Sequence, residues 1–235
     1  MKIVSEYLDK WSIVIGLEVH VQLNSRTKMF TPTNWSYGES PNTQICPITL
    51  GYPGTLPTIN DAAVRKGIAV GLSLNCSINQ ITKFARKHYF YPDLPKGYQI
   101  TQFDSPLCEG GFIELEGSKR IRIARAHLEE DAGKTIHTLE GNALIDYNRC
   151  GAPLLEIVSE PDMECSEDAL EYLKSLKEII TSVNASDCDM EKGNLRVDIN
   201  VSVMPKGSNE LGTRREVKNV NSFRNVEKAI HYEYK

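Results

Sequence analysis

Residues 17–23 alternate strictly between apolar and polar side chains, and this alternation restricts the fold of the chain more than any other feature. Successive side chains of an extended strand point to opposite faces of a sheet. Glu18, His20 and Gln22 therefore share one face, and the apolar positions share the other: Leu17, Val19, Val21 and Leu23. A carboxylate beside an imidazole on a rigid strand suits a metal ion or acid–base chemistry, and the alternative is a solvated sheet face.

Three further segments have the pattern of strands with at least one buried face. Residues 120–124 alternate basic and apolar side chains, and residues 154–158 are apolar except for Glu156. Residues 195–203 alternate most clearly, with apolar side chains at every odd-numbered position. The even-numbered positions share the polar face: Arg196, Asp198, Asn200 and Ser202.

Three other segments have the apolar spacing of helices. The first covers residues 61–74, with Asn60 or Asp61 as its N-cap, and the second begins after Ser166, which we expect to be its N-cap. The buried stripe of the second helix is predicted to contain Leu170, Leu173, Leu176, Ile180 and Val183. The third helix starts near residues 221–222. Helices separated by hairpin-like strands favour an α+β fold with a mainly antiparallel sheet over a doubly wound parallel sheet.

Composition excludes some classes of function. The formal net charge is −4, so the chain is not a basic clamp for nucleic acid, and contacts with RNA must come from local patches or from other parts of an assembly. Residues 1–6 lack the apolar core of a signal peptide, and no apolar run approaches the length that crosses a membrane. The six cysteines are scattered, as is typical of reduced thiols, and we expect a cytoplasmic protein.

Acidic residues on the predicted polar faces form a candidate site together with His20 and, as a further candidate, His127. The acids are Glu18, Glu129, Glu130, Asp131, Glu156 and Asp198. Two carboxylates ~4 Å apart repel each other by roughly 4 kcal/mol at an effective dielectric constant of about 20. A gathered set therefore needs divalent cations or shared protons, and Mg²⁺ prefers oxygen ligands. The alternative is a solvated face, although Glu156 lies in an apolar run and requires a partner.

Residues 83–93 interleave cations with aromatic rings. The cations are Lys83, Arg86 and Lys87, and they would hold phosphate oxygens if the rings stacked on bases. The alternative is that the rings form core and the cations form surface; these rings are Phe84, Tyr89 and Tyr91. Residues 212–219 leave the same choice open for Arg214, Arg215 and Lys218. Lys96, in the turn at residues 93–98, is expected at the mouth of a cleft.

Six motifs extend these patterns along the whole chain. They read GLEVHVQL at residues 16–23, KHYFYPDLPKGYQI at 87–100, HLEEDAGK at 127–134, DYNRCGAPLLEIVSEPD at 146–162, GNLRVDINVS at 193–202 and KNVNSF at 218–223. In this order they resemble the motifs of one family, the B subunits of aspartyl/glutamyl-tRNA(Asn/Gln) amidotransferases.

The resemblance implies a fold similar to the catalytic fold of glutamine synthetase and the guanidino kinases, a cradle around an antiparallel sheet. Members of the family are about twice as long, with a helical domain and a tail domain following the cradle. We therefore expect residues 1–235 to form the catalytic cradle domain, with those later domains absent from this chain. The predicted third helix, which reaches Lys235 without a Gly or Pro, fits that expectation.

The resemblance also implies a ligase reaction. ATP, with Mg²⁺, phosphorylates the side-chain carboxylate of Glu or Asp misacylated on tRNA(Gln) or tRNA(Asn), and ammonia then displaces the phosphate to form the amide. Ammonia comes from glutamine through a partner amidase. The expected partners are this amidase, which is the A subunit of the amidotransferase, its small C subunit, in a heterotrimer, and misacylated tRNA, with no membrane. The rival interpretation is a non-catalytic scaffold that binds tRNA and docks the amidase.

Motif positions assign roles to particular residues as the resemblance implies them. The catalytic residues are expected to be Glu18, Glu130, Glu156 and Asp198. The metal ligands are expected among Glu18, His20, Glu129, Glu130 and Glu156. The residues that contact ATP or phosphate are expected to be Lys83, Arg86, Lys87, Arg149 and Arg196. Many relatives have Cys-Pro-x-Cys where this chain has Cys46-Pro-Ile-Thr49, so we predict no zinc.

Overall fold

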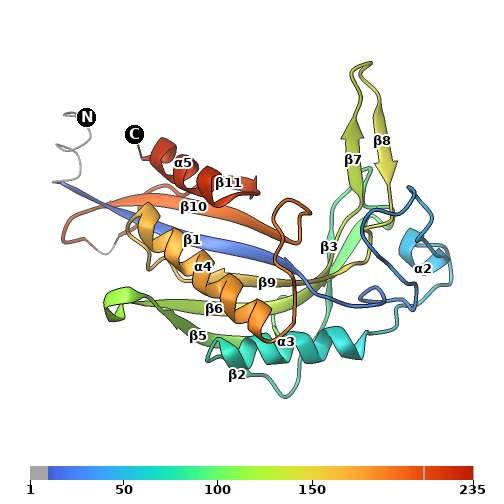
Figure 1. The fold of residues 1–235 in the computed structure, drawn as a ribbon, viewed down its shortest axis with the longest axis horizontal. Coiled ribbons are helices and arrows are strands. Elements are labelled where there is room, and N and C mark those ends of the chain that lie inside the picture. Colours follow the sequence, from blue (N-terminus) through green and yellow to red (C-terminus); the bar gives the residue numbers. More distant parts are fainter. Residues whose placement is uncertain (1–9, 209, 235) are drawn as a thin grey trace.

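The structure is a computed structural model that describes residues 10–208 and 210–234. An antiparallel seven-stranded sheet runs through it in the order β11-β10-β1-β9-β6-β5-β2 (Figure 1). Its strands are β1 (Trp11–Gln22), β2 (Ser77–Ile78), β5 (Cys108–Glu114), β6 (Arg120–Glu130), β9 (Pro153–Ser159), β10 (Leu195–Pro205) and β11 (Arg215–Val220). The predicted α+β class with a mainly antiparallel sheet is confirmed, and the likeness to glutamine synthetase and the guanidino kinases stays a prediction.

Two hairpins lie outside this sheet. The first pairs β3 (Ala85–His88) with β4 (Tyr98–Thr101), and the second, β7 (Lys134–His137) with β8 (Ala143–Asp146), projects from the body (Figure 1). The helices are α2 (Pro47–Leu50), α3 (Asp61–Ser73), α4 (Ser166–Ser182) and α5 (Phe223–Glu233), and a 3₁₀ turn covers Glu116–Ser118. Within the described ranges, no helix combines the length and the apolar character needed to cross a membrane.

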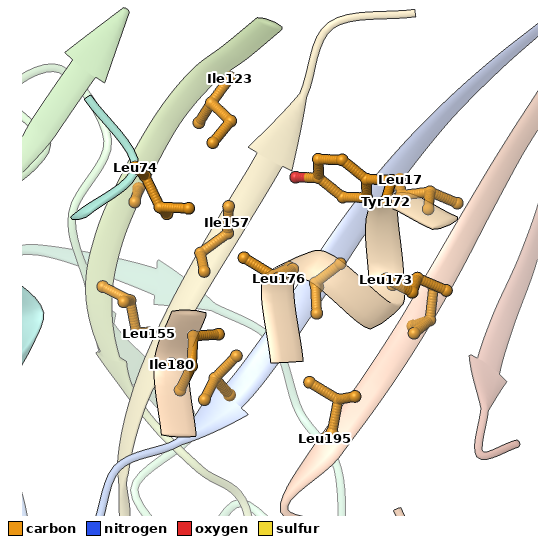
Figure 2. Close-up of a cluster of buried hydrophobic side chains, with 14 of the residues drawn as sticks. Leu17, Leu74, Ile123, Leu155, Ile157, Tyr172, Leu173, Leu176, Ile180 and Leu195 are labelled. Atoms are coloured by element: carbon orange, nitrogen blue, oxygen red, sulfur yellow. The ribbon is translucent and has the colours of Figure 1, made fainter. Parts of the chain in front are cut away.

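The core lies between the sheet and the helices α3 and α4. Tyr172, Leu176 and Ile180 of α4 are fully buried, and Figure 2 shows them in a cluster with side chains of the sheet, among them Leu17 and Ile157. The predicted apolar row of residues 17–23 is buried, and so are the apolar positions 195, 197, 199 and 201 of β10. Because the helices cover the apolar face, the opposite face of β1, β9 and β10 is left to carry polar side chains.

Two of the three helices begin where the sequence predicts. The side chains of Asn60 and Ser222 accept hydrogen bonds from the backbone N–H groups of Ala63 and Asn225, as N-caps do. The prediction for Ser166 is wrong by one residue, because Cys165 holds the extended cap conformation and Ser166 is the first helical residue. The Ser166 hydroxyl instead lies 3.2 Å from Nε2 of His231 in α5. The third helix ends at Glu233, and Lys235 lies outside the described residues.

The fold predicts a strong intolerance to a side chain at Gly111 of β5. A Cβ there would lie 2.3 Å from the carbonyl oxygen of Leu74 and 2.4 Å from the sulfur of Cys76, at the end of α3. We expect Gly111→Ala to lower the free energy of unfolding by about 1–3 kcal/mol or more, because backbone must move to relieve the overlap. The control is Gly16→Ala in β1, whose Cβ would meet Pro161 at an ordinary 3.7 Å. Urea unfolding measures both, and equal losses would contradict the prediction.

Candidate active site

Strand register brings one histidine–carboxylate cluster together from three adjacent strands. His20 of β1 is opposite Glu156 of β9, and Glu156 is opposite His127 of β6. Glu129 lies two residues beyond His127 and therefore points to the same face. Nε2 of His20 is 3.2 Å from the nearer oxygen of Glu156 and 3.7 Å from that of Glu129. Nε2 of His127 is 3.4 Å and 3.7 Å from the same two carboxylates.

Burial and charge set the protonation of this cluster. Burial acts to lower the pKa of His20, but the hydrogen bond to Glu156 and the charge of Glu129 outweigh it, so the pKa is raised. Burial acts to raise the pKa of Glu156, but the hydrogen bond and charge of His20, with His127, lower it to about 2. Without a bound cation, the cluster therefore holds an ionised Glu156 against a histidine that retains its proton readily.

Glu18 belongs to a second acidic cluster. It is opposite Asp198 of β10, and carboxylate oxygens of Glu18, Asp198 and Glu216 lie within 4.8 Å of one another. The amide of Asn200 donates to Glu18, and the backbone N–H of Asn219 donates to Asp198 at 2.7 Å. The sequence pattern alone groups Glu18 with His20, whereas the structure divides the polar face of β1 between two clusters.

The structure places Glu130 away from both clusters. Because side chains alternate along β6, Glu130 points to the face opposite Glu129. Its carboxylate forms a buried ion pair with Lys96 and accepts a hydrogen bond from the backbone N–H of Ile100 at 3.0 Å. The structure therefore does not bring Glu130 together with His20; Glu129 lies beside His20 instead, and a role of Glu130 in metal binding stays a prediction. Lys96 itself is mostly buried, with a side chain that is 7% exposed, and it lines a second cavity of about 460 Å³ within the segment 90–97.

Cations and members of both clusters line one cavity of about 590 Å³. Arg196 donates to Asp131 at 3.0 Å, and Nε of Arg149 is 3.5 Å from the same carboxylate oxygen. The charged residues that line the cavity are His20, Lys87, Asp93, Glu129, Asp131, Arg149, Glu156, Arg196, Asp198 and Lys218. The cavity thus joins the first cluster, one member of the second and the predicted phosphate contacts Lys87, Arg149 and Arg196.

The remaining predicted phosphate contacts lie elsewhere. Arg86 is exposed on β3, with its guanidinium 4.9 Å from the centre of the Tyr98 ring, and Lys83 is exposed before that strand. Neither residue lines the cavity. Of the aromatic residues, Phe84 packs edge-on against Phe30, while Tyr89 and Tyr91 line the cavity. The core interpretation is therefore confirmed for Phe84, and phosphate contact by the cations stays a prediction.

Several side chains of the site were not predicted from the sequence. Thr101 of β4 donates to Glu129 at 3.1 Å, and Gln99 lines the cavity. Glu216 of β11 joins Glu18 and Asp198. The strand β4 has only four residues, and its alternation is too short to stand out in the sequence.

Buried carboxylates, imidazoles and arginines around one cavity are the features of an enzyme active site that handles anionic substrates. Comparison with known families agrees: the family model of the GatB/GatE catalytic domain matches residues 13–235, and the chain belongs to this family.

Individual proteins of the family that are similar to this chain have a more specific name. The chain is 54% identical over 229 residues to the B subunit of the aspartyl/glutamyl-tRNA(Asn/Gln) amidotransferase of Caldanaerobacter subterraneus subsp. tengcongensis, covering 96% of this chain and 48% of that protein. It is 55% identical over 225 residues to the protein of the same name from Clostridium botulinum strain Loch Maree, covering 94% and 47%. For Thermoanaerobacter pseudethanolicus the identity is 53% over 229 residues, covering 96% and 48%. The chain spans about half the length of these relatives.

The first cluster fits a divalent cation. Ligand atoms of His20, Glu129 and Glu156 lie within 4.8 Å of one another. In the described part of the chain, no lysine or arginine lies within ion-pair distance of either glutamate, so the two histidines are their closest charged partners. Carboxylate oxygens suit Mg²⁺ and Mn²⁺, and a neutral imidazole adds one nitrogen ligand.

Proposed function

We propose that this chain is the ATP-dependent catalytic domain of a tRNA-dependent amidotransferase, with Glu or Asp misacylated on tRNA as its substrate. The observation that carries the proposal is that one cavity is lined both by the His20–Glu129–Glu156 cluster and by Arg149, Arg196 and Lys218. The same cavity offers ligands for a divalent cation and cations for phosphate oxygens. The names of the relatives supply the substrate class.

The proposed reaction has two steps. In the first, an oxygen of the substrate carboxylate attacks the γ-phosphorus of ATP, the bond to ADP breaks, and an acyl phosphate forms. In the second, ammonia attacks the acyl carbon, loses a proton, and phosphate leaves. Glutamine is the proposed source of the ammonia, through an amidase (the A subunit) that, with a small C subunit, completes a heterotrimer in the cytoplasm.

The chain's own residues would bind and orient the charged reactants. Arg196 and Arg149 already share Asp131, so their guanidinium groups are held in place before phosphate arrives. Such preorganised charge lowers the barrier because it needs no rearrangement during the reaction. His20, Glu129 and Glu156 would hold Mg²⁺, with His20 deprotonated. When bound, Mg²⁺ would neutralise charge that develops on the transferred phosphoryl group.

The second cluster has a separate proposed role. Lys218 lies 3.1 Å from Glu216 and 3.9 Å from Asp198, next to the cavity. We propose that Glu18 and Asp198 act in catalysis by positioning Lys218 and the backbone at Asn219 toward the nucleotide. Glu130 would act indirectly, by holding Lys96 and Ile100 behind β6.

The proposal is tested by ATP hydrolysis in the full-length assembled complex. We expect ADP to form only when misacylated tRNA is present, in step with amidated product when glutamine is supplied. A complex that binds misacylated tRNA but forms no ADP at saturating ATP and Mg²⁺ would support the non-catalytic scaffold instead.

A measurement of metal binding distinguishes the roles of the neighbouring residues Glu129 and Glu130. Glu129→Gln is expected to weaken Mn²⁺ binding by more than about tenfold, since even loss of a partner outside the ligand shell costs ~10–100-fold in affinity. Glu130→Gln is the matched control, because its side chain points to the other face of β6 and should leave Mn²⁺ binding within about twofold of the unsubstituted protein. Titration followed by electron paramagnetic resonance measures both. Stronger loss in Glu130→Gln would restore the grouping expected from the sequence.

A further inference from the structure

A further cavity, of about 230 Å³, lies beside the active-site cavity on the same face of the sheet. Its lining includes Val14, Gly16 and Glu18 of β1. Because side chains alternate along a strand, these positions share their face with His20, which lines the active-site cavity. Carboxylate oxygens of Glu18 and Asp198 lie within 4.8 Å of each other, and Asp198 also lines the active-site cavity. The smaller cavity, which we call the Gly16 cavity, therefore meets the active-site cavity at the second acidic cluster.

Away from this cluster the lining of the Gly16 cavity is mainly apolar. It includes Val158 and Pro161, at and just after the end of β9, and Leu211 in the segment that joins β10 to β11. This segment lies against β10, where the backbone N–H of Gly212 donates to the carbonyl oxygen of Val203 at 2.9 Å. An apolar lining with a few polar groups is typical of a site that holds the ring of a small organic ligand.

Gly16 is a glycine that the packing of the protein does not require. A Cβ there would meet nothing closer than Pro161, at 3.7 Å, whereas a Cβ at Gly111 would overlap the carbonyl oxygen of Leu74. The backbone of Gly16 also has no positive φ. A glycine inside a strand weakens the strand, and it commonly marks a place where a ligand approaches the backbone closely. The floor of the Gly16 cavity is therefore open to a ligand.

Two polar side chains of the lining have unused bonding capacity. Arg214 is exposed and forms no ion pair among the described residues, whereas its neighbours Arg215 and Lys218 do. The amide nitrogen of Asn200 donates to Glu18 at 3.0 Å, and its Oδ1 has no hydrogen-bond partner in the described part of the chain. A guanidinium group stacks on an aromatic ring, and an amide oxygen accepts from an amino group. An adenine ring offers both a π-face and an amino group.

We propose that the Gly16 cavity holds the base and ribose of ATP, an inference that rests on the function proposed for the active-site cavity. The base would lie over Gly16 beside Arg214, and the phosphates would extend to Lys218 and on toward the His20 cluster. Gly16 lies four residues from His20 along β1, about 13 Å at the rise of a strand. The ribose and three phosphates bridge that separation.

The second acidic cluster suits the ribose. Carboxylates accept hydrogen bonds from ribose hydroxyls in dinucleotide-binding sites. Glu18 accepts one hydrogen bond, from Asn200, and a carboxylate has lone pairs for several. Because this cluster lies where the two cavities meet, it stands between the proposed positions of the base and of the phosphates.

Nucleotide binding to the full-length assembled complex tests the proposal without turnover. Equilibrium dialysis with Mg²⁺ and no tRNA measures the affinities of ATP and of inorganic tripolyphosphate, which has the phosphates but neither base nor ribose. Gly16→Val places a branched side chain on the floor of the cavity. It should weaken ATP binding by about tenfold or more, the scale of a lost base contact, and leave tripolyphosphate binding within about twofold.

A surface variant guards against misfolding of Gly16→Val. Arg214→Gln should weaken ATP binding by about threefold or more, the scale of a lost cation–π contact, again with little effect on tripolyphosphate. Arg215→Gln is the matched control, because it removes the same charge from the next residue. The Arg215 side chain is 72% exposed, pairs with Glu233 and lines neither cavity, so ATP binding should stay within about twofold. Thermal unfolding confirms that each variant is folded.

Photolabelling with 8-azido-ATP locates the base directly. Mass spectrometry should find the label on peptides that contain Pro161 or Leu211, and excess ATP should prevent it. Normal ATP affinity in folded Gly16→Val and Arg214→Gln, or label confined to peptides outside the Gly16 cavity, would overturn this inference and leave the proposed function standing. An unsubstituted complex that binds no ATP would overturn both.

Discussion

Replacing Glu156 by Gln is expected to reduce tRNA-dependent ATP turnover by at least about 100-fold, the scale seen when one preorganised electrostatic group is removed from an active site. Glu156 is the nearer of the two carboxylates that both histidines contact, and its strand β9 lies between β1 and β6. Gln keeps the shape of the side chain and removes its charge. The variant should therefore remain folded while losing a cation ligand.

The measurement is ADP formation by the assembled complex at saturating ATP and misacylated tRNA. Glu114→Gln is the control, because Glu114 ends β5 on the surface with a side chain that is 48% exposed and does not line the cavity. We expect its turnover to match the unsubstituted complex. If Glu156→Gln retains full turnover in an intact complex, the catalytic assignment of the cavity is wrong.

Lys96→Met is expected to lower the free energy of unfolding by about 3 kcal/mol at pH 7, because it leaves a buried charge without its partner. Both side chains of the Lys96–Glu130 pair are nearly inaccessible to water. After the substitution, Glu130 keeps the hydrogen bond from Ile100 and loses its one ion-pair partner among the described residues, with the charge of the buried Lys28 still acting on it.

The loss should depend on pH in a defined direction. Burial raises the pKa of Glu130 in the folded protein, although Lys96 acts to lower it. Without Lys96 this pKa rises further above its unfolded value, so the folded state favours the protonated acid and loses stability as the pH rises through that range. The deficit of Lys96→Met should therefore be largest at pH 7 and shrink toward pH 5. Urea unfolding at both values, with Lys96→Met/Glu130→Gln as a rescue, measures this. An equal deficit in the double variant would contradict it.

The strands with long alternation were predictable from local sequence. In β1 and β10 the spacing of apolar residues assigns each side chain to a face, because a strand has a side-chain period of two whatever lies next to it. The helix starts at Asn60 and Ser222 were equally predictable from local sequence, since a cap needs only neighbouring backbone groups. The short β3, β4, β7 and β8 have four residues each and gave no such signal.

The sequence identified the acidic residues of the site as a set, but it did not show how they are divided between separate clusters. Glu129 and Glu130 are adjacent in the sequence and equally acidic, and alternation alone says only that they point in opposite directions. The register of β6 against β9 puts Glu129 with Glu156 and His20, and it leaves Glu130 to Lys96. That register is held by contacts between residues far apart in the chain, as when His20 meets Glu156. Residue type and face follow from local backbone geometry, whereas the partners of a buried charge depend on which distant strands pair and in which register.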